Sequence, residues 1–360
     1  MVPRPRPVVR LVEVAAGAGV SLATASRALA GREGVSDEVA DRVRQVAGEL
    51  GYAANPHART LAGGLTSTLG LIVHEIGDPY FSEIARGVLS AAGDEGLMVQ
   101  ICHSGRDPER ELAQIRTLIA QRVRIIIVAG SGYIDPTLHS EFRDELSAFQ
   151  ETGGRVAMIG RHFVSADAVR PDNEAAGQAV AGHVLSLGHR AIAVATGPLR
   201  LTTVADRLAG VAAALEREGL SLADLPVVET DFTRDGGESA AEQILREHRE
   251  VTAIVALNDA MATGVLSALR SHGVSVPGSM SVAGFDDVPV AADLAPSLTT
   301  VRLPMAQMGE WALTMALKPR AARPRRKATG HELIVRDSTG PPPPVSAAAS
   351  ASTAPTPRSA

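Results

Sequence analysis

Arg27 is the one long hydrogen-bond donor in the segment Leu22–Leu29. A guanidinium can donate two parallel hydrogen bonds to the edge of a guanine, which is the commonest base-specific contact in the major groove of DNA. Leu22 and Ala23 are apolar, so they could contact a thymine methyl group or exclude water but could not hydrogen-bond a base. The simpler alternative is an arginine on the solvated face of a helix. The elements around Arg27 decide between the two.

The sequence contains no arrangement of residues that is typical of catalysis. It lacks the G-x-S-x-G turn of hydrolases, the G-x-x-x-x-G-K-[ST] phosphate loop and the His-Glu-x-x-His zinc motif. The single cysteine, Cys102, can form neither an internal disulfide nor a zinc cluster. His183 and His189 fall in one apolar helix-and-loop region, where we expect structural roles. We therefore expect no enzymatic activity, no cofactor and no metal site.

Composition indicates a soluble protein with two differently charged parts. Of its 360 residues, 45% are hydrophobic and 21% are charged, and no 18 uncharged apolar residues run together as a membrane helix requires. The N-terminus reaches Glu13 before any continuous apolar stretch, so we expect no secretory signal, no membrane partner and a cytoplasmic location. Residues 1–62 hold eight Arg and six acidic residues, whereas the other 298 hold 27 basic and 34 acidic residues. A basic head on an acidic body is compatible with a nucleic-acid module.

Three short helices are predicted in the first 52 residues. A first helix is favoured by the apolar residues Val12, Val14, Ala15 and Ala18 and ends near Gly19. Ser21 can cap a second helix, Leu22–Leu29, because its hydroxyl can accept from a free N–H of the first turn. Ser36 can cap a third helix in the same way. Two helices joined by a few residues around Gly19 form a helix-turn-helix, whose second helix lies in the major groove.

The stretch from Asn55 to Gly64 predicts a helix that cannot form alone. Asn55 can cap it, Pro56 suits the first helical position, and Gly63-Gly64 ends it after about two turns. A helix this short is unstable in water by itself, so we expect it to order only on a partner.

From Thr68 onward the sequence alternates predicted strands with predicted helices. The predicted strands are Leu69–Val73, Met98–Ile101, Ile125–Val128, Val156–Ile159, Ala191–Ala195, Val227–Thr230, Ala253–Leu257 and Ser281–Phe285. The predicted helices are Phe81–Ala92, Glu109–Ala120, Asn173–Leu187, Ala205–Glu218 and Met261–Ser271. This alternation implies parallel sheets covered on both faces, and roughly 270 residues exceed one comfortable sheet. We therefore expect two α/β lobes with a ligand site between them, at the carboxyl ends of the strands.

Further motifs follow one another in a fixed order along the chain. In the first 61 residues they are Val14–Ser21, Ala23–Leu29, Gly51-Tyr52 and Asn55–Leu61. In the body they are Asp78–Phe81, Asp172-Asn173, Leu187–Arg190, Asp206–Leu208, Asn258-Asp259, Gly284–Asp287 and Leu298–Val301. Together they resemble the lactose-repressor-type (LacI/GalR) transcription regulators over about residues 10–338.

The resemblance implies an all-α helix-turn-helix headpiece followed by an α/β two-lobed effector domain like that of periplasmic binding proteins. It implies that residues 66–162 and about 293–325 form the lobe next to DNA. The intervening residues would form the distal lobe, to which a strand near Glu332–Val335 would return. A homodimer, sometimes a tetramer, is also implied.

Four segments follow from these features. They are a headpiece (1–54), a hinge helix and linker (55–65), an effector-binding and dimerisation domain (66–338) and a disordered tail (339–360). The tail is so rich in Pro, Ala, Ser and Thr that it cannot bury enough apolar surface to order itself.

The resemblance assigns DNA contacts to the second helix and favours the base-reading interpretation of Arg27. Leu22 and Ala23 match the pair that reads base edges in the family, and Thr24 and Ser26 match phosphate contacts. Ala30 stands where the family often carries Asn, which puts one phosphate contact in doubt.

The predicted hinge helix adds a minor-groove contact. Leu61 matches a leucine that wedges into the minor groove and kinks the central base step. The alternative is that Leu61 packs against Leu50 or its dimer partner. The full set of predicted DNA-binding residues is Ser21, Leu22, Ala23, Thr24, Ser26, Arg27, Asn55, Ala58 and Leu61.

Arg207, Asn258 and Asp286 match the family's effector-contacting positions. A guanidinium, an amide and a carboxylate together can satisfy the hydroxyl groups of a polyol. Their plain alternatives are a helix-surface ion pair for Arg207 and a helix cap for Asn258. The remaining predicted effector residues are Tyr80, Phe81, Arg161 and Phe232.

Two positions near the cleft depart from the family pattern. Gly160 stands where Asp is usual, and Leu303 stands where Gln is common. Both changes remove a hydrogen-bonding group. The effector is therefore expected to be smaller or less polar than a typical sugar, or to be held differently.

The predicted function is a DNA-binding transcriptional regulator, a repressor, whose affinity for a palindromic operator is controlled by a carbohydrate or related small molecule. The alternative is a sugar-binding transport protein or a sugar-modifying enzyme on the same two-lobed fold. Release from DNA and recruitment to DNA both remain open as responses to the effector, as do a dimer and a tetramer.

Overall fold

In the computed structural model, the residues described are 9–29, 33–52 and 67–344. Contacts divide the chain into two compact units, Met1–Thr66 and Ser67–Ala360. The predicted DNA-binding residues Asn55, Ala58 and Leu61 lie outside the described residues.

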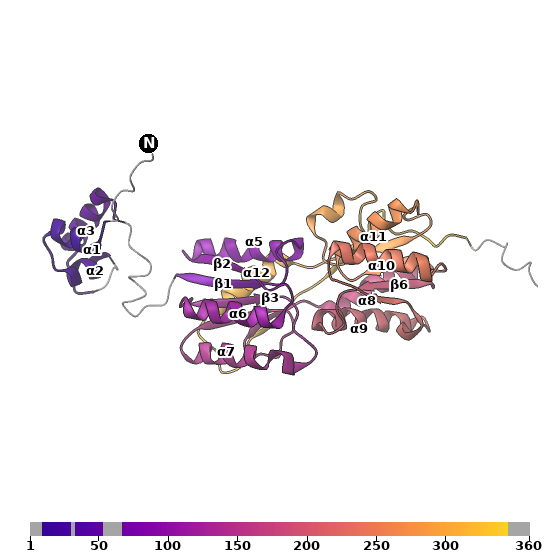
Figure 1. Cartoon of the computed structure of the whole chain (residues 1–360), viewed down its shortest axis with the longest axis horizontal. Coiled ribbons are helices and arrows are strands. Elements are labelled where there is room, and N and C mark those ends of the chain that lie inside the picture. The colour runs from indigo at the N-terminus through magenta and orange to yellow at the C-terminus, as the bar shows by residue number, and fades with distance from the viewer. Residues whose placement is uncertain (1–8, 30–32, 53–66, 345–360) are drawn as a thin grey trace, which may run out of the picture. The chain divides into compact units, whose positions relative to one another are not determined.

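The first unit contains the three predicted helices (Figure 1). They are α1 (Leu11–Ala18), α2 (Leu22–Leu29) and α3 (Asp37–Leu50). Gly19 ends α1 in the left-handed conformation, with a φ of 66°. The Ser21 hydroxyl accepts from the N–H of Thr24 at 3.1 Å and so caps α2 as predicted. Ser36 is the N-cap residue of α3 as predicted, but its side chain makes no capping hydrogen bond.

The first lobe of the second unit is a parallel six-stranded sheet in the order β11-β5-β4-β3-β1-β2. The strands are β1 (Thr68–Val73), β2 (Met98–His103), β3 (Ile125–Ala129), β4 (Arg155–Ile159), β5 (Asp167–Arg170) and β11 (Arg326–Ala328). Helices α5 (Pro79–Asp94) and α12 (Met305–Leu317) cover one face, and α6 (Pro108–Ala120) and α7 (Ser140–Glu151) cover the other (Figure 1). Alternate strand residues reach the two cores: Leu71 joins the first and Ile72 the second.

The second lobe is a parallel four-stranded sheet in the order β7-β6-β8-β9. The strands are β6 (Ile192–Thr196), β7 (Val227–Glu229), β8 (Ala253–Ala256) and β9 (Ser281–Ala283). Helices α8 (Asn173–Ser186) and α9 (Thr202–Arg217) pair on one face, and α10 (Arg234–Glu247) and α11 (Asp259–Ser271) pair on the other (Figure 1). Glycine lets the first pair approach closely, because a Cβ on Gly210 would lie 1.9 Å from the carbonyl oxygen of Glu174.

Three segments cross between the lobes, and two of them form a small antiparallel sheet. In this sheet β10 (Thr300–Arg302) pairs with β12 (Glu332–Ile334). The remaining short elements are the 3-10 turns η1 (Pro136–His139), η2 (Leu222–Asp224) and η3 (Pro289–Ala292). In the described ranges, no helix is both long and apolar enough to cross a membrane.

The structure corrects the predicted lobe boundaries. Strands β5 and β11 belong to the first-lobe sheet, so that lobe extends beyond residues 162 and 325. The strand at Glu332–Ile334 pairs with β10 rather than with the second-lobe sheet. The chain reaches that sheet at Ser338, whose carbonyl oxygen accepts from the N–H of Val282 at 2.8 Å.

The predicted disordered tail also begins too early. The carbonyl oxygen of Gly340 lies 2.8 Å from Nε2 of His189, and the hydroxyl of Thr339 lies 2.9 Å from Nε2 of His183. Residues 339 and 340 are therefore part of the folded body. The same contacts give His183 and His189 the structural roles expected of them.

Candidate effector site and DNA-binding surface

Helix α2 presents its predicted DNA-binding residues to solvent. Ala25 and Ala28 are buried and attach the helix to α1 and α3. Leu22 is 52% exposed, and Ala23, Ser26 and Arg27 are exposed as well. An exposed arginine and exposed apolar residues on one helix are compatible with contacts to base edges in a major groove.

Two hydroxyl groups lie close together at the start of α2. The hydroxyls of Ser21 and Thr24 lie 2.8 Å apart, and Ser21 also caps the helix. Arg27 is exposed and makes no ion pair with any residue of the described ranges. The start of α2 and its exposed face therefore offer one long donor, three hydroxyls (Ser21, Thr24 and Ser26) and two apolar contacts.

A cavity between the two lobes brings six of the seven predicted effector residues together. Its volume is about 30 Å³. The predicted residues that line it are Tyr80, Phe81, Arg207, Phe232, Asn258 and Asp286. They come from the starts of α5 and α11, from α9, and from the loops after β7 and β9. As expected for parallel sheets, the cavity lies at the carboxyl ends of the strands.

Arg207 is the buried centre of this site. Its Nε donates to Oδ1 of Asn173 at 3.0 Å, and its Nη2 donates to Oδ1 of Asp286 at 2.7 Å. A third bond runs from Nη1 to the carbonyl oxygen of Leu257, and the guanidinium stacks over the Phe285 ring at 3.7 Å. Since Arg207 is only 2% exposed, the alternative of a helix-surface ion pair is wrong. These contacts hold the guanidinium in place at the wall of the cavity.

Asp286 combines burial with an uncommon backbone conformation. It is 3% exposed and has a φ of 112°. Burial raises the pKa of the Asp286 carboxyl to about 7, although Arg207 opposes the shift, and the nearby carboxylate of Asp78 adds to it. A carboxyl with a pKa near neutrality can accept or donate hydrogen bonds to a ligand hydroxyl.

Asn258 fits both of the readings that the sequence allowed. Its Oδ1 accepts from the N–H of Met261 at 2.8 Å and so caps α11. Its amide nitrogen bonds to no group in the described part of the chain, and the residue lines the cavity. The cap therefore fixes the side chain while leaving its donor free.

Arg161 does not line the cavity. Its guanidinium makes two hydrogen bonds to Asp206 on α9, at 2.6 and 3.1 Å. The prediction of Arg161 as an effector contact is therefore not supported by its position, because the side chain is occupied by a bridge between the lobes. Leu303 is buried in the core and is likewise absent from the cavity lining.

The departure at Gly160 has a steric reason. Gly160 lines the cavity with a φ of 115°, and a Cβ placed there would lie 2.0 Å from the carbonyl oxygen of Gly130. An aspartate cannot occupy this position unless the backbone moves. The local backbone conformation therefore explains why residue 160 is glycine and not aspartate.

Asp78 and Arg106 line the cavity, although they were not predicted from the sequence as effector contacts. Asp78 caps α5 by accepting from the N–H of Tyr80 at 3.0 Å, and burial raises the pKa of its carboxyl. Arg106 lies 3.9 Å from Asp78, and its guanidinium stands over the Phe232 ring at 5.6 Å. Asp78 was visible in the Asp78–Phe81 motif. Arg106 was indicated only by its place after the carboxyl end of β2.

A buried carboxylate lies behind the first-lobe wall of the cavity. Glu111 is fully buried, with Nε2 of His74 at 3.8 Å and Nε2 of His139 at 3.6 Å. Burial alone would raise the pKa of Glu111, but the two imidazoles hold it down to about 2. His74 also lines the cavity, which connects this group to the site. No group of three or more acidic, His or Cys side chains within residues 9–29, 33–52 and 67–344 is arranged to hold a metal ion.

Direct hydrogen bonds join the two lobes along one side of the cavity. The N–H of Thr202 donates to the carbonyl oxygen of Gly132 at 2.9 Å. The N–H of Thr203 donates to the hydroxyl of Ser131 at 2.9 Å. Since Ser131 and Thr203 both line the cavity, the lobes are in contact at the site itself.

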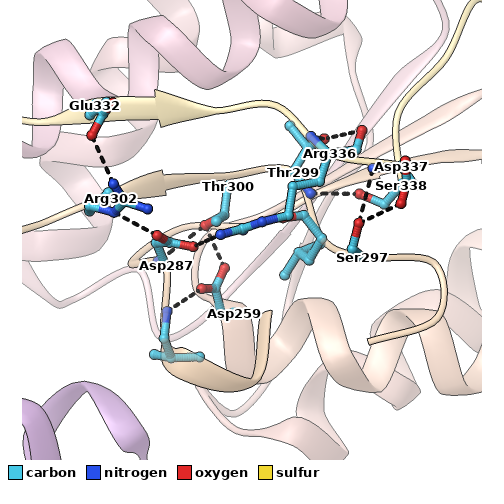
Figure 2. Close-up of polar contacts among 12 residues, drawn as sticks. Asp259, Asp287, Ser297, Thr299, Thr300, Arg302, Glu332, Arg336, Asp337 and Ser338 are labelled. Atoms are coloured by element: carbon cyan, nitrogen blue, oxygen red, sulfur yellow. Dashed lines mark hydrogen bonds and ion pairs between the residues drawn. The ribbon is translucent and has the colours of Figure 1, made fainter. Parts of the chain in front are cut away.

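Asp287, the residue after Asp286 in the chain, is tied to the crossover strands (Figure 2). The carboxylate of Asp287 accepts from Arg302 on β10 and lies 2.7 Å from Arg336, which follows β12. Asp259 accepts from the hydroxyl of Thr300 at 2.6 Å, and burial raises its pKa well above the ordinary value. The loop that carries Asp286 is thus held between two segments that connect the lobes.

Two family models match the chain. The model for bacterial regulatory proteins of the lacI family matches residues 10–55, and the periplasmic binding protein-like domain matches residues 181–339. The HTH-type transcriptional regulator DegA of Bacillus subtilis is 32% identical over 341 residues, which cover 92% of this chain and 98% of DegA.

Solved structures of regulators have the same fold as this chain. The complex of the transcriptional regulator CelR with cellobiose is 28% identical, covers 92% of this chain and 100% of its own, and has a TM-score of 0.68. The lac repressor dimer bound to operator and the anti-inducer ONPF has a TM-score of 0.79 at 24% identity, covering 93% and 100% of the two chains. The predicted fold class, a helical N-terminal unit followed by a two-lobed α/β body, is confirmed.

Proposed function

Because this chain belongs to the lacI family of bacterial regulatory proteins, and is thus a DNA-binding transcriptional regulator, we propose that its interlobe cavity binds a small polyhydroxylated effector. Binding in the cavity changes the geometry of the two lobes and thereby the affinity for the operator. Effector and operator then alter each other's affinity by the same factor. We further propose that the protein acts as a repressor.

The observation that carries this proposal is the buried Arg207–Asp286 pair on the wall of the cavity. At this wall a ligand meets a donor-only guanidinium beside a carboxylate, with the free amide nitrogen of Asn258 close by. A hydroxyl group can donate to the carboxylate and accept from the guanidinium or the amide. Several adjacent hydroxyls would satisfy all three, and the aromatic rings of the lining would cover the apolar faces of a sugar ring. The cellobiose bound by CelR is a ligand of this class.

The small volume of the cavity explains how binding would move the lobes. At about 30 Å³, it has room for roughly two water molecules. A monosaccharide is several times larger, so it enters only when the lobes shift. The hydrogen bonds between Gly132 and Thr202 and between Ser131 and Thr203 are the contacts that must change. Movement at Asp286 would pass through Asp287 to the crossover residues Arg302 and Arg336.

DNA recognition is proposed for the exposed face of α2. Arg27 would read a guanine, Leu22 and Ala23 would contact bases, and Ser21, Thr24 and Ser26 would contact phosphates. Asn55, Ala58 and Leu61 remain part of the proposal on sequence alone. We propose a homodimer on a palindromic operator, as supported by the same fold in the lac repressor dimer on its operator.

We propose that the cavity binds and releases its ligand unchanged, since the related proteins are regulators rather than enzymes. The competing function is a sugar-binding transport protein or a sugar-modifying enzyme on the same fold. Action on DNA would place the protein in the cytoplasm. A sugar that binds but leaves DNA binding unaffected would favour transport, and a sugar that is chemically altered would favour catalysis.

A gel-shift assay on DNA from the upstream region of the protein's own gene tests the proposal. The wild-type protein should give a sequence-specific shift that a sugar from a panel of mono- and disaccharides changes. Arg27→Ala should relax specificity at one base position in each half-site, at a cost of about 1–3 kcal/mol there. Equal weakening on operator and unrelated DNA would show that Arg27 contacts phosphate only. Absence of any specific shift, on this or selected DNA, would overturn the regulator function.

A further inference from the structure

A row of arginines follows the edge of the first-lobe sheet at which its parallel strands begin. The N–H of Arg124, just before β3, donates to the carbonyl oxygen of Thr68 at the start of β1 at 3.0 Å. The N–H of Arg155 at the start of β4 donates in turn to the carbonyl oxygen of Arg124 at 3.1 Å. Arg124 and Arg155 therefore lie on adjacent strand starts, at the edge where the chain enters the body.

The segment between α12 and β11 brings further positive charge to the same edge. The carbonyl oxygen of Arg325 accepts from the N–H of Ala168 at 2.9 Å, which places this segment at the start of β5. Three basic residues of the segment are exposed, namely Lys318, Arg320 and Arg323, and so is Arg326, the first residue of β11. With Arg124 and Arg155 they form what we call the basic edge.

The basic edge contains a small polar hollow. Its volume is about 60 Å³, and Arg155, Lys318 and Arg320 line it together with the polar side chains of Gln150 and Ser165. This is room for roughly four water molecules, comparable with one phosphate group. Asp167 also lines the hollow, but its carboxylate accepts from Nη1 of Arg325 at 2.7 Å and from the N–H of Arg325 at 2.7 Å.

The residues of the basic edge form no ion pairs with the carboxylates nearest to them in the fold. Asp94 ends α5, Glu95 follows it, and Glu151 ends α7, so three carboxylates lie at this end of the sheet. Throughout the described part of the body, no carboxylate oxygen lies within 4.0 Å of a basic nitrogen of the six basic-edge residues. The surrounding body is acidic, with 27 basic and 34 acidic residues after residue 62. A polyanion would be repelled by most of this body and attracted at the basic edge.

We propose that the basic edge binds backbone phosphates of the DNA that flanks the operator. The starts of β1, β3, β4 and β5 span about 14 Å at roughly 4.8 Å per strand. A row of this length matches successive phosphates of a DNA strand better than one small anion. The proposal rests on the DNA-binding function, and the chain runs directly from Thr68 into the linker that leads to the helix-turn-helix. The body would thus add sequence-independent affinity to the base contacts made by α2.

The test compares two operator duplexes, one ending at the half-sites and one extended by about 15 base pairs on each side. The variant is the full-length triple substitution Arg124→Gln/Arg155→Gln/Arg320→Gln. On the extended duplex its affinity should fall about tenfold or more. The slope of log K against log salt should become shallower by about 0.9 for each lost phosphate contact. On the short duplex its affinity should equal that of the wild type.

A matched control removes the same charge from the second lobe. Arg200, Arg249 and Arg270 are exposed arginines there, and Arg200→Gln/Arg249→Gln/Arg270→Gln should bind both duplexes like the wild type. Because Arg155 is half-buried, Lys318→Gln/Arg320→Gln/Arg323→Gln provides a second test at fully exposed positions, with an unchanged melting temperature expected.

Two results would overturn the proposal. One is an affinity and salt slope on the extended duplex that equal those of the control variant. The other is an equal loss on both duplexes at an unchanged melting temperature. Failure of the regulator function itself is distinguishable, because the wild type would then bind neither duplex specifically.

Discussion

The second-lobe wall of the cavity consists of buried polar groups that already bond to one another, whereas the first-lobe wall carries charged groups with weaker protein contacts. Arg207 makes three hydrogen bonds, and its contact with Asp286 is 2.7 Å long. Across the cavity, Asp78 and Arg106 approach only to 3.9 Å. The second-lobe wall is therefore preorganised for hydroxyl groups in general. Asp78 and Arg106 can give up their long mutual contact to bind a ligand. We therefore expect these two residues to decide which ligand binds.

The largest effect should come from breaking the second-lobe network. Arg207→Ala leaves the Asp286 carboxylate buried without its partner, which costs about 3–5 kcal/mol in the free energy of unfolding. Effector binding should be lost at the same time. Denaturant unfolding and calorimetric titration measure the two effects. Arg161→Ala removes an arginine outside the cavity and should cause neither; loss of effector binding in that variant would contradict the placement of the site.

The first-lobe pair should change ligand choice more than stability. Arg106→Gln should weaken effector binding about tenfold, or change the order of preference among related sugars, because a partner of the ligand is lost. Asp78→Asn should act similarly while keeping the cap of α5, since asparagine also caps helices well. The free energy of unfolding should fall less than in Arg207→Ala, because Asp78 and Arg106 approach each other only to 3.9 Å. Unchanged affinities across the sugar panel would show that the first-lobe wall does not select the ligand.

A pH-dependent stability should distinguish Asp286 from ordinary carboxyls. Its pKa in the folded protein is about 7, above the usual value of 3.8, so the folded state holds this proton more tightly than the unfolded state. Its contribution to stability is therefore present at low pH and is lost as pH rises from about 4 to about 7. The slope is at most about 1.4 kcal/mol per pH unit. Subtracting the profile of Asp286→Asn from that of the wild type should reveal this decline; a flat difference would show an ordinary pKa.

The smallest effect is expected at the bridge between Arg161 and Asp206. Both side chains are partly exposed, at 35% and 28%, so the pair should contribute about 0–1 kcal/mol. Arg161→Gln should change effector affinity less than threefold. A large loss of affinity would mean that Arg161 leaves Asp206 to contact the ligand, as the sequence had suggested.

The polar groups of the second-lobe wall were predictable from the sequence, whereas the pairing of Asp78 with Arg106 on the first-lobe wall was not. Arg207, Asn258 and Asp286 lie in local motifs, so their positions on one wall were predictable together. Arg106 lies in a left-handed turn with a φ of 58°, and only the folded chain brings it to Asp78 and Phe232. Arg161 has the residue type of a ligand contact, but a partner 45 residues away occupies it.

Element prediction failed where long-range contacts replace local patterns. Helix α10 contains Gly236 and Gly237, which argue against a helix. In the fold, a Cβ on Gly237 would lie 2.1 Å from the carbonyl oxygen of Met261, so the glycine is required for packing against α11. Strand β5 pairs with β11, from more than 150 residues later, and no local pattern reveals such a partner. Strands β1, β3, β4, β6 and β8, by contrast, are apolar runs that a buried parallel sheet makes recognisable.

The central claim is that a ligand held by Arg207 and Asp286 controls DNA binding. A thermal-shift screen of cellobiose, ribose and related saccharides first identifies the sugar that stabilises the wild type. Operator affinity is then measured with and without that sugar, in the wild type and in Asp286→Asn. The account predicts a change in the wild type that equals the change in sugar affinity caused by operator, and no change in the variant at the same sugar concentration. A variant that responds to that concentration as the wild type does would contradict the claim.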